Sequence, residues 1–257
     1  MKKIALLIIK IILKFLRLIK WLVDSLIYYF DILKNYLNGQ ECTKLKDCLM
    51  LAKFKAGQPP ASDRYIEYPW LLENINLKSG RLLDIGSTIG DLLSGSLPQD
   101  VEIHCLNLND KKFNSREIKF KKGDIRQSGY PDNYFDLISC ISTLEHIGVA
   151  GRYGCDEDPA GDFKAMAEIK RILKPGGELL LSVPYGASDV LPINKLYNKT
   201  RIENLFSGWE IISQELRKFS KTWRVWLKVD EAEAAKVDMK KDGWYALCLI
   251  KAHKSEK

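Results

Sequence analysis

The residues best suited to chemistry stand in one polar segment, "STLEHIGVAGRYGCDEDPAGD", which covers residues 142–162. It contains His146, one of only three histidines in the chain, directly after Glu145. A neutral imidazole can take a proton from an acceptor hydroxyl, so His146 is the candidate general base. The alternative is that His146 only braces this loop through hydrogen bonds.

The same segment offers polar groups to a substrate. Loops above a rigid sheet usually carry specificity, so we expect Glu145, Arg152 and Tyr153 to contact the acceptor. The alternative is a solvated connector with a helix cap at Asp162.

A second candidate site is the glycine turn "DIGSTIG", which starts at Asp84. Gly86 and Gly90 let the backbone approach a ligand and turn sharply into a helix. Asp84 selects among ligands, because a carboxylate at this turn repels a pyrophosphate and favours a cationic amino group. Thr88 stands at a position where such turns often have glycine.

Strand and helix patterns alternate around these residues, which predicts an α/β fold. We expect a doubly wound, mostly parallel, seven-stranded Rossmann-like sheet with an antiparallel final strand. The predicted strands are "RLLDIG", "VEIHCLNL", "IKF", "YFDLISCIS", "ELLLSVP", "WEIISQEL" and "GWYALCLIKA". The spacing of apolar residues in "DFKAMAEIKRIL" predicts a helix, which "KPGG" ends.

Taken in chain order, these motifs resemble those of class I S-adenosylmethionine-dependent methyltransferases, over residues 65–252. "LEH" and "LKPGG" are most similar to the branch often labelled methyltransferase type 11. The resemblance implies that Asn107 holds the ribose hydroxyls and that Gly123 and Asp124 lie by the adenine. It implies the cofactor S-adenosyl-L-methionine and these cofactor-binding residues: Asp84, Gly86, Ser87, Gly90, Asn107, Asp124 and Ile125.

Two positions depart from the family pattern. Thr88 replaces the middle glycine, and Asn107 replaces the usual acid, so the ribose would be recognised by an amide. Asp110 is a second candidate for the carboxylate if the strand runs further. Glu145 and His146 also resemble part of an E-x-x-E-H metal motif, but Ser142 stands at its first glutamate, so we expect no metal.

The resemblance implies methyl transfer to a small or lipid-linked acceptor, and a hydroxyl on a glycan or lipid is our leading hypothesis. The alternative is a non-catalytic module that assists a membrane glycan-assembly complex. A nucleic-acid substrate is disfavoured, because much of the net charge of +7 lies near the N-terminus and no N-P-P-Y type motif occurs. The six cysteines form no C-x-x-C pair, which indicates reduced thiols in a cytoplasmic protein.

Residues 1–37 have the pattern of a basic amphipathic helix. Their cations, such as Lys10, Lys14 and Arg17, share one arc of a helical wheel and interrupt any transmembrane span. We expect this segment to lie on the anionic inner face of a membrane. The alternatives are packing on its own domain or on a second copy, a transmembrane span, and a signal peptide. Residues 38–66 are expected to be a connector and residues 67–257 the methyltransferase domain.

Overall fold

The computed structural model describes residues 62–87, 90–113, 118–150, 156–191, 194–220 and 225–255. The described strands are β1 (Gly80–Ile85), β2 (Val101–Asn107), β3 (Lys119–Lys122), β4 (Phe135–Ile141), β5 (Leu173–Tyr185), β6 (Trp209–Ser220), β7 (Val225–Val229) and β8 (Ala246–Lys254). The described α-helices are α3 (Arg64–Asn74), α4 (Gly90–Ser96), α5 (Gly161–Ile172), α6 (Lys199–Leu205), α7 (Glu231–Ala235) and α8 (Met239–Asp242).

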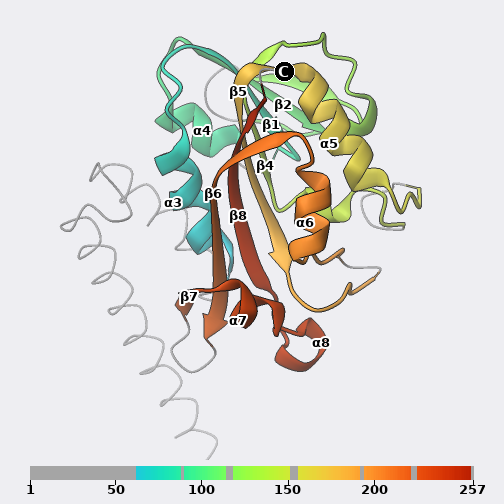
Figure 1. The fold of residues 1–257 in the computed structure, drawn as a ribbon. Coiled ribbons are helices and arrows are strands. Elements are labelled where there is room, and N and C mark those ends of the chain that lie inside the picture. Colours follow the sequence, from blue (N-terminus) through green and yellow to red (C-terminus); the bar gives the residue numbers. More distant parts are fainter. Residues whose placement is uncertain are drawn as a thin grey trace, which may run out of the picture. The chain divides into compact units, whose positions relative to one another are not determined.

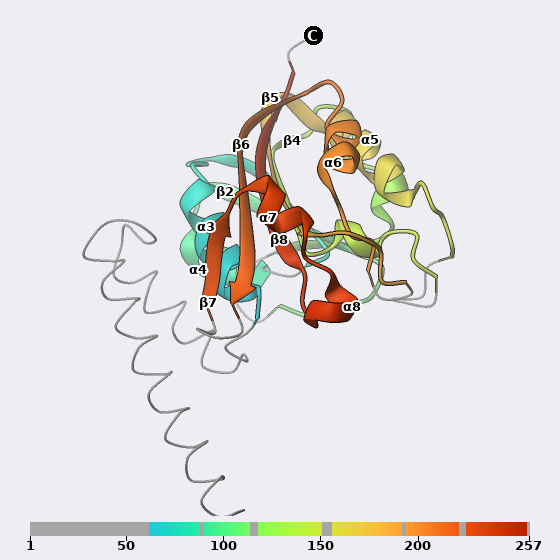
Figure 2. The same cartoon turned by 60° about the horizontal axis from the view of Figure 1, so that its bottom comes forward.

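The described strands form one sheet of eight strands in the order β3-β2-β1-β4-β5-β8-β6-β7. The neighbours from β3 to β5 pair in parallel, whereas β8, β6 and β7 are antiparallel to their neighbours. Helices α3 and α4 lie on one side of the sheet, and α5 and α6 lie on the other (Figures 1 and 2). This confirms the doubly wound, mostly parallel Rossmann-like fold.

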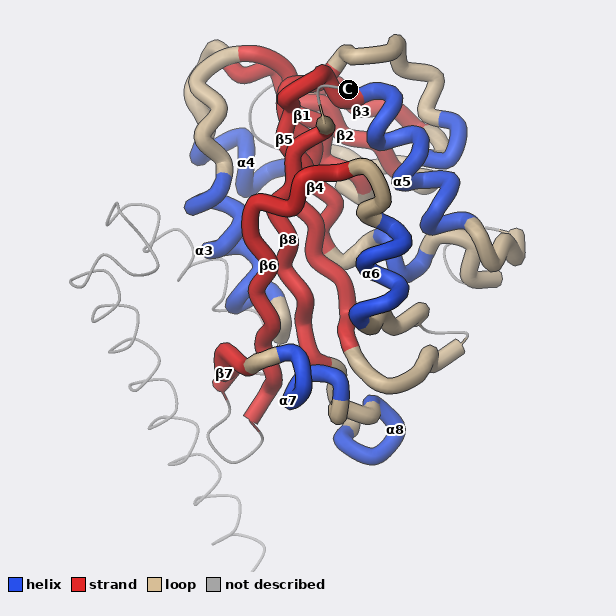
Figure 3. Tube along the Cα trace, viewed as in Figure 1, coloured by secondary structure: helices blue, strands red, loops and turns tan. Residues whose placement is uncertain are grey.

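The expected count of seven strands is one too low. The additional strand is β7, a short edge strand of 5 residues that pairs only with β6 among the described strands. Its Leu227 is 46% exposed, so the strand lacks the continuous apolar run of a buried strand. Figure 3 shows β7 beside β6 at the edge of the sheet.

The parallel strands carry the candidate site because their carboxyl ends meet at one edge of the sheet. Ile85, the last residue of β1, is in register with Leu106 of β2 and Cys140 of β4. The glycine turn after β1 therefore lies between the chain segments that follow β2 and β4.

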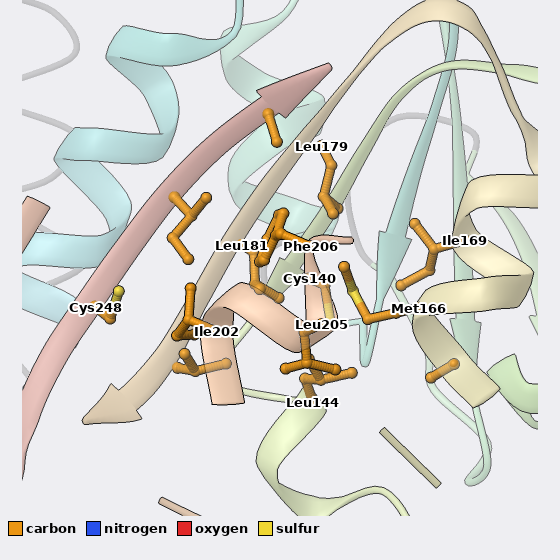
Figure 4. Close-up of a cluster of buried hydrophobic side chains, with 14 of the residues drawn as sticks. Cys140, Leu144, Met166, Ile169, Leu179, Leu181, Ile202, Leu205, Phe206 and Cys248 are labelled. Carbon is orange, nitrogen blue, oxygen red and sulfur yellow. The ribbon is translucent and has the colours of Figure 1, made fainter. Parts of the chain in front are cut away.

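The largest part of the core lies between the sheet and helices α5 and α6 (Figure 4). Met166 and Ile169 of α5 are buried at the expected helical spacing, and Ile202 and Leu205 of α6 pack nearby. Phe163, another apolar residue of the same segment, is 40% exposed and belongs to the solvent side of α5. The three cysteines in the described part of the chain, Cys105, Cys140 and Cys248, are buried free thiols.

The expected amphipathic helix over residues 1–37 lies outside the described residues. The connector expected over 38–66 overlaps the described part only at its end, where α3 already begins at Arg64. No helix within the described ranges is long and apolar enough to cross a membrane.

Candidate functional site

A cavity of about 350 Å³ lies at the carboxyl ends of β1, β2, β3 and β4. This volume is in the range of pockets that hold small molecules and cofactors. The walls are formed by Arg64, Ile85, Gly86, Leu106, Asn107, Leu108, Asn109, Lys111, Gly123, Asp124, Ile125, Arg126, Ser142, Thr143, His146, Ile147 and Gly148. Of the sequence-predicted residues, the cavity therefore brings together Gly86, Asn107, Gly123, Asp124, Ile125 and His146.

The glycine turn packs tightly against the segment that follows β4. Gly86 has a φ of +89°, and a Cβ there would lie 2.3 Å from Thr143 Oγ1. Ser87, at a φ of 51°, is buried, and no described residue gives its Oγ a hydrogen bond. Positive φ favours glycine, and the short contact leaves no room for a side chain at residue 86. The positive φ and the short distance to Thr143 therefore both restrict residue 86 to glycine.

Asp84 and Gly90 flank this turn without lining the cavity. Asp84 is buried at the end of β1, where Cys105 Sγ lies 3.8 Å from its Oδ2. Gly90 begins α4, and a Cβ there would lie 2.6 Å from the Phe113 ring and 3.0 Å from Cys105 Sγ. The lack of a side chain at Gly90 therefore allows α4 to pack closely on β2. Thr88 lies outside the described residues.

Asn107, the last residue of β2, joins two turns at the cavity wall. Its Nδ2 donates to the Gly86 carbonyl at 2.6 Å, and its Oδ1 accepts from the Asn109 backbone N–H at 2.9 Å. Asp110 is not among the lining residues; its exposed carboxylate pairs with Lys122 at 2.8 Å. The second candidate for a ribose carboxylate is thus engaged outside the cavity lining.

Asp124 lines the cavity with its carboxylate bound to Arg126. Arg126 Nη2 lies 2.6 Å from Asp124 Oδ2, and the Arg126 backbone N–H donates to Oδ1 at 2.8 Å. Arg126 Nη1 also reaches Asp158 at 2.9 Å. Burial alone would raise the pKa of Asp124, but the bonds from Arg126 outweigh it and lower that pKa. Ile125, which follows Asp124, is buried and lines the same wall.

The residues after β4 form the end of the cavity where we expect the reacting groups, called the reacting end below. Ser142 has a φ of 43°, and it is followed by Thr143 and a short 3-10 helix over Leu144–His146. His146 lines the cavity, and its Nε2 lies 3.5 Å from Glu145 Oε1. The imidazole is therefore in reach of a bound molecule, as a general base at this position requires.

Glu145 lies behind the cavity wall. Its side chain is buried, it does not line the cavity, and no described residue gives its Oε2 a hydrogen bond. Burial, with a smaller contribution from the nearby carboxylate of Glu67, raises the pKa of Glu145 to about 8. Arg152 and Tyr153, the other predicted substrate contacts, lie outside the described residues.

Sequence reasoning missed Arg64 and Glu67, which α3 brings to this end of the site. Arg64 lines the cavity and pairs with the fully buried Glu67. Glu67 Oε1 also accepts from Ser142 Oγ and Ser182 Oγ, both at 2.6 Å. A possible signal was the charged pair at i and i+3 in the aromatic segment "RYIEYPWL", whose first three residues we placed in the connector.

Arg64 and Glu67 shift each other's pKa. Burial, followed by the nearby Asp63, raises the pKa of Glu67, although Arg64 and the two serine hydroxyls oppose the shift. Burial alone would lower the pKa of Arg64, but Glu67 and Asp63 outweigh it, so that pKa is raised. Arg64 is therefore a fixed cation at the reacting end of the cavity.

No group of three or more His, Cys, Asp or Glu side chains suited to a metal occurs in the part of the chain that the structure describes. Trp226 packs against Phe219 and Trp244 on the sheet. The indole Nε1 atoms of Trp226 and Trp244 find no acceptor among the described residues.

The strand order, the glycine turn after β1 and the cavity at the strand ends define the class I S-adenosylmethionine-dependent methyltransferase fold. The YcgJ protein of Bacillus subtilis has this arrangement at a TM-score of 0.52 and 16% identity, with 75% of this chain and 100% of that chain covered. The chain belongs to the family described as "Caenorhabditis protein of unknown function, DUF268", which it matches over residues 100–251.

Two sequence relatives are named for methyl transfer. A sterol 24-C-methyltransferase of Gibberella zeae is 28% identical over 142 residues, which cover 49% of this chain and 33% of that protein. The ubiquinone/menaquinone biosynthesis C-methyltransferase UbiE of Vibrio cholerae is 26% identical over 132 residues, or 46% of each chain. The chain thus spans less than half the length of these relatives.

Proposed function

We propose that this protein is an S-adenosylmethionine-dependent methyltransferase. The observation that carries the proposal is the meeting of four strand-end segments, far apart in sequence, around one cavity of about 350 Å³. These segments contain Gly86, Asn107, Asp124 and His146. The names of the sequence relatives support the same reaction class.

The residues around the cavity fit the cofactor in shape and charge. Leu106, Ile125 and Ile147 provide apolar surface for a flat base. The amino-acid end of the cofactor carries an ammonium and a carboxylate. Asp84 is buried behind the glycine turn and does not line the cavity, so its carboxylate would attract the ammonium from behind the turn. Arg64, which lines the cavity, would complement the carboxylate.

When bound, the cofactor supplies an electrophilic methyl group on a sulfonium. The chain's own task is alignment, because holding two reactants in line removes much of the entropic barrier. Thr143 and His146 lie at the reacting end and would position the acceptor. With a hydroxyl acceptor, His146 would also take the proton that the oxygen loses.

We infer that the acceptor is a small or lipid-linked molecule at the inner membrane surface, with a hydroxyl on a glycan or lipid as the leading candidate. The basic amphipathic pattern of residues 1–37 supports a membrane location. The names of both relatives specify small molecules, a sterol and a quinone, and carbon as the methylated atom. A carbon acceptor is therefore the alternative to test.

Calorimetric titration of the full-length protein with S-adenosylmethionine and S-adenosylhomocysteine tests the cofactor part of the proposal. We expect binding of both, and loss of binding in Asp84→Ala. Asp100→Ala is the control, because it removes an exposed aspartate outside the cavity lining. Absence of binding by the native protein would overturn the proposal and favour a non-catalytic module.

Mass spectrometry of extracts from cells with and without the protein tests the acceptor. We expect a methylated glycan or lipid that loses about 14 Da, the mass of CH₂, when the protein is absent. Fragmentation then decides between oxygen and carbon as the methylated atom.

A further inference from the structure

Asn107 joins three of the segments that form the cofactor cavity. Its Nδ2 donates to the Gly86 carbonyl after β1, and its Oδ1 accepts from the Asn109 N–H after β2. Its backbone carbonyl accepts from the Gly123 N–H after β3 at 2.9 Å. One residue thus fixes the distances between the three turns that would surround a nucleoside.

The amide is the chemical group that this position requires. The Gly86 carbonyl oxygen lies 2.6 Å from Nδ2, so the side-chain atom there must be a donor. An ionised carboxylate at residue 107 would place an acceptor against an acceptor and leave the Gly86 carbonyl without this partner. Such a loss costs more than the bond itself contributes.

The carboxylates of Asp124 and Asp110, which follow β3 and β2, are paired with basic side chains. Asp124 is the one acidic residue among the lining residues, and Arg126 binds both of its oxygens. Asp110 pairs with Lys122 at the exposed surface. The described part of the cavity therefore offers no unpaired carboxylate to a pair of ribose hydroxyls.

We infer that Asn107 is a positioning residue that holds the glycine turn against β2, and that the nucleoside is bound without a ribose-binding carboxylate. This inference rests on the proposed cofactor. It has two consequences. The glycine turn should loosen when the amide is removed, with or without cofactor, and the ribose hydroxyls should contribute little to affinity through residue 107.

The first experiment measures backbone amide hydrogen exchange over residues 82–90 in the full-length protein without cofactor. We expect faster exchange in Asn107→Ala and in Asn107→Asp than in the native protein. Asn109→Asp is the matched control. It adds the same charge to the cavity wall and leaves both hydrogen bonds of the Asn107 side-chain amide in place. Unchanged exchange in both Asn107 variants would overturn the inference.

The second experiment is a double-mutant cycle between residue 107 and the ribose. Calorimetry compares S-adenosylhomocysteine with its 2′,3′-dideoxy analogue on the native protein, Asn107→Ala and Asn107→Asp. We expect Asn107→Ala to weaken binding of both ligands by about the same factor, on the order of tenfold. Asn107→Asp should weaken binding by more than Asn109→Asp does.

Two results would show instead that residue 107 binds the ribose directly. The inference is wrong if Asn107→Asp binds S-adenosylhomocysteine more tightly than the native protein. It is also wrong if Asn107→Ala loses affinity only for the ligand that has the hydroxyls. If the native protein binds neither ligand, the proposed function fails, and the exchange experiment still decides the role of Asn107.

Discussion

Glu67 Oε1 accepts a hydrogen bond of 2.6 Å from Ser142 Oγ, although 75 positions separate the two residues. Ser182 Oγ donates to the same oxygen at 2.6 Å, and the Ser142 N–H donates to Ser182 Oγ at 2.9 Å. This closed set of bonds joins α3 to β4 and β5 just behind the cavity. A fully buried carboxylate needs such donors, so Glu67 holds the reacting end of the site in place.

We expect Glu67→Ala to reduce the free energy of unfolding by about 3–5 kcal/mol, because it leaves Arg64 and two serine hydroxyls without their buried partner. Glu67→Gln should cost less, because its amide oxygen still accepts from the serines. Urea denaturation followed by tryptophan fluorescence measures both values. Glu203→Ala, at an exposed site, should change stability by less than about 0.5 kcal/mol. An equally small effect at Glu67 would contradict this role.

Gly86→Ala is expected to abolish cofactor binding. A Cβ at 2.3 Å from Thr143 Oγ1, at a φ of +89°, forces the turn to move away from its present position. Gly129→Ala is the control, because Gly129 also has a positive φ of +65° but lies outside the cavity lining. Calorimetry should show lost affinity only for the Gly86 variant, with some loss of thermal stability in both. Equal affinities would show that the turn tolerates a side chain.

The buried Glu145 should make stability depend on pH. Its carboxyl has a pKa of about 8 in the folded protein, against 4.5 for the ordinary group. Between these values the folded state binds the proton more tightly than the unfolded state, so stability falls as the pH rises. Each pH unit in this window contributes at most about 1.4 kcal/mol. Below pH 4.5 and above pH 8 the contribution of Glu145 is constant.

The measurement compares the native protein with Glu145→Gln, which cannot titrate at residue 145. From pH 5 to pH 8, the native protein should lose stability relative to the variant. Asp63, Arg64 and Glu67 of α3 are present in both proteins, so the difference in free energy of unfolding reports on Glu145. Parallel pH profiles would show that the pKa of Glu145 lies near its ordinary value.

His146→Ala tests whether the imidazole is the base. With a hydroxyl acceptor, turnover should fall by about 10²–10⁴-fold while the affinity for S-adenosylhomocysteine stays near that of the native protein. His146→Gln retains hydrogen-bonding groups but cannot act as a base, so it should be as slow as the alanine variant. If His146 only braces the loop, Gln should restore turnover, and Ala should lower thermal stability or raise the Michaelis constant.

Membrane attachment should depend on the cations near the N-terminus. Replacing Lys10, Lys14, Arg17 and Lys20 with Gln in the full-length protein should weaken binding to vesicles that contain anionic lipid, by about 1 kcal/mol for each cation. Cosedimentation at increasing salt should release the native protein as well. Retention of the variant and of the native protein at high salt would instead favour a transmembrane span.

The sequence by itself determined the fold class and the approximate place of the site. The order of apolar strands and helical spacings is local, and glycine, aspartate and strand-end positions can be read without knowing what they contact. Gly86, Asn107, Asp124 and His146 were therefore predicted as site residues, and they line the cavity. Strand β7 was missed because a short, half-exposed edge strand leaves little pattern in the sequence.

Only the tertiary structure decided what these side chains contact. Glu67 reaches Ser142 and Ser182 because the fold brings α3 beside the turn after β4 and beside β5, and no spacing rule connects residues so far apart. Asn107 meets the Gly86 carbonyl because β1 and β2 are parallel neighbours in a particular register. Local sequence determines which elements form, whereas hydrogen-bond partners depend on distances that exist only after those elements have packed.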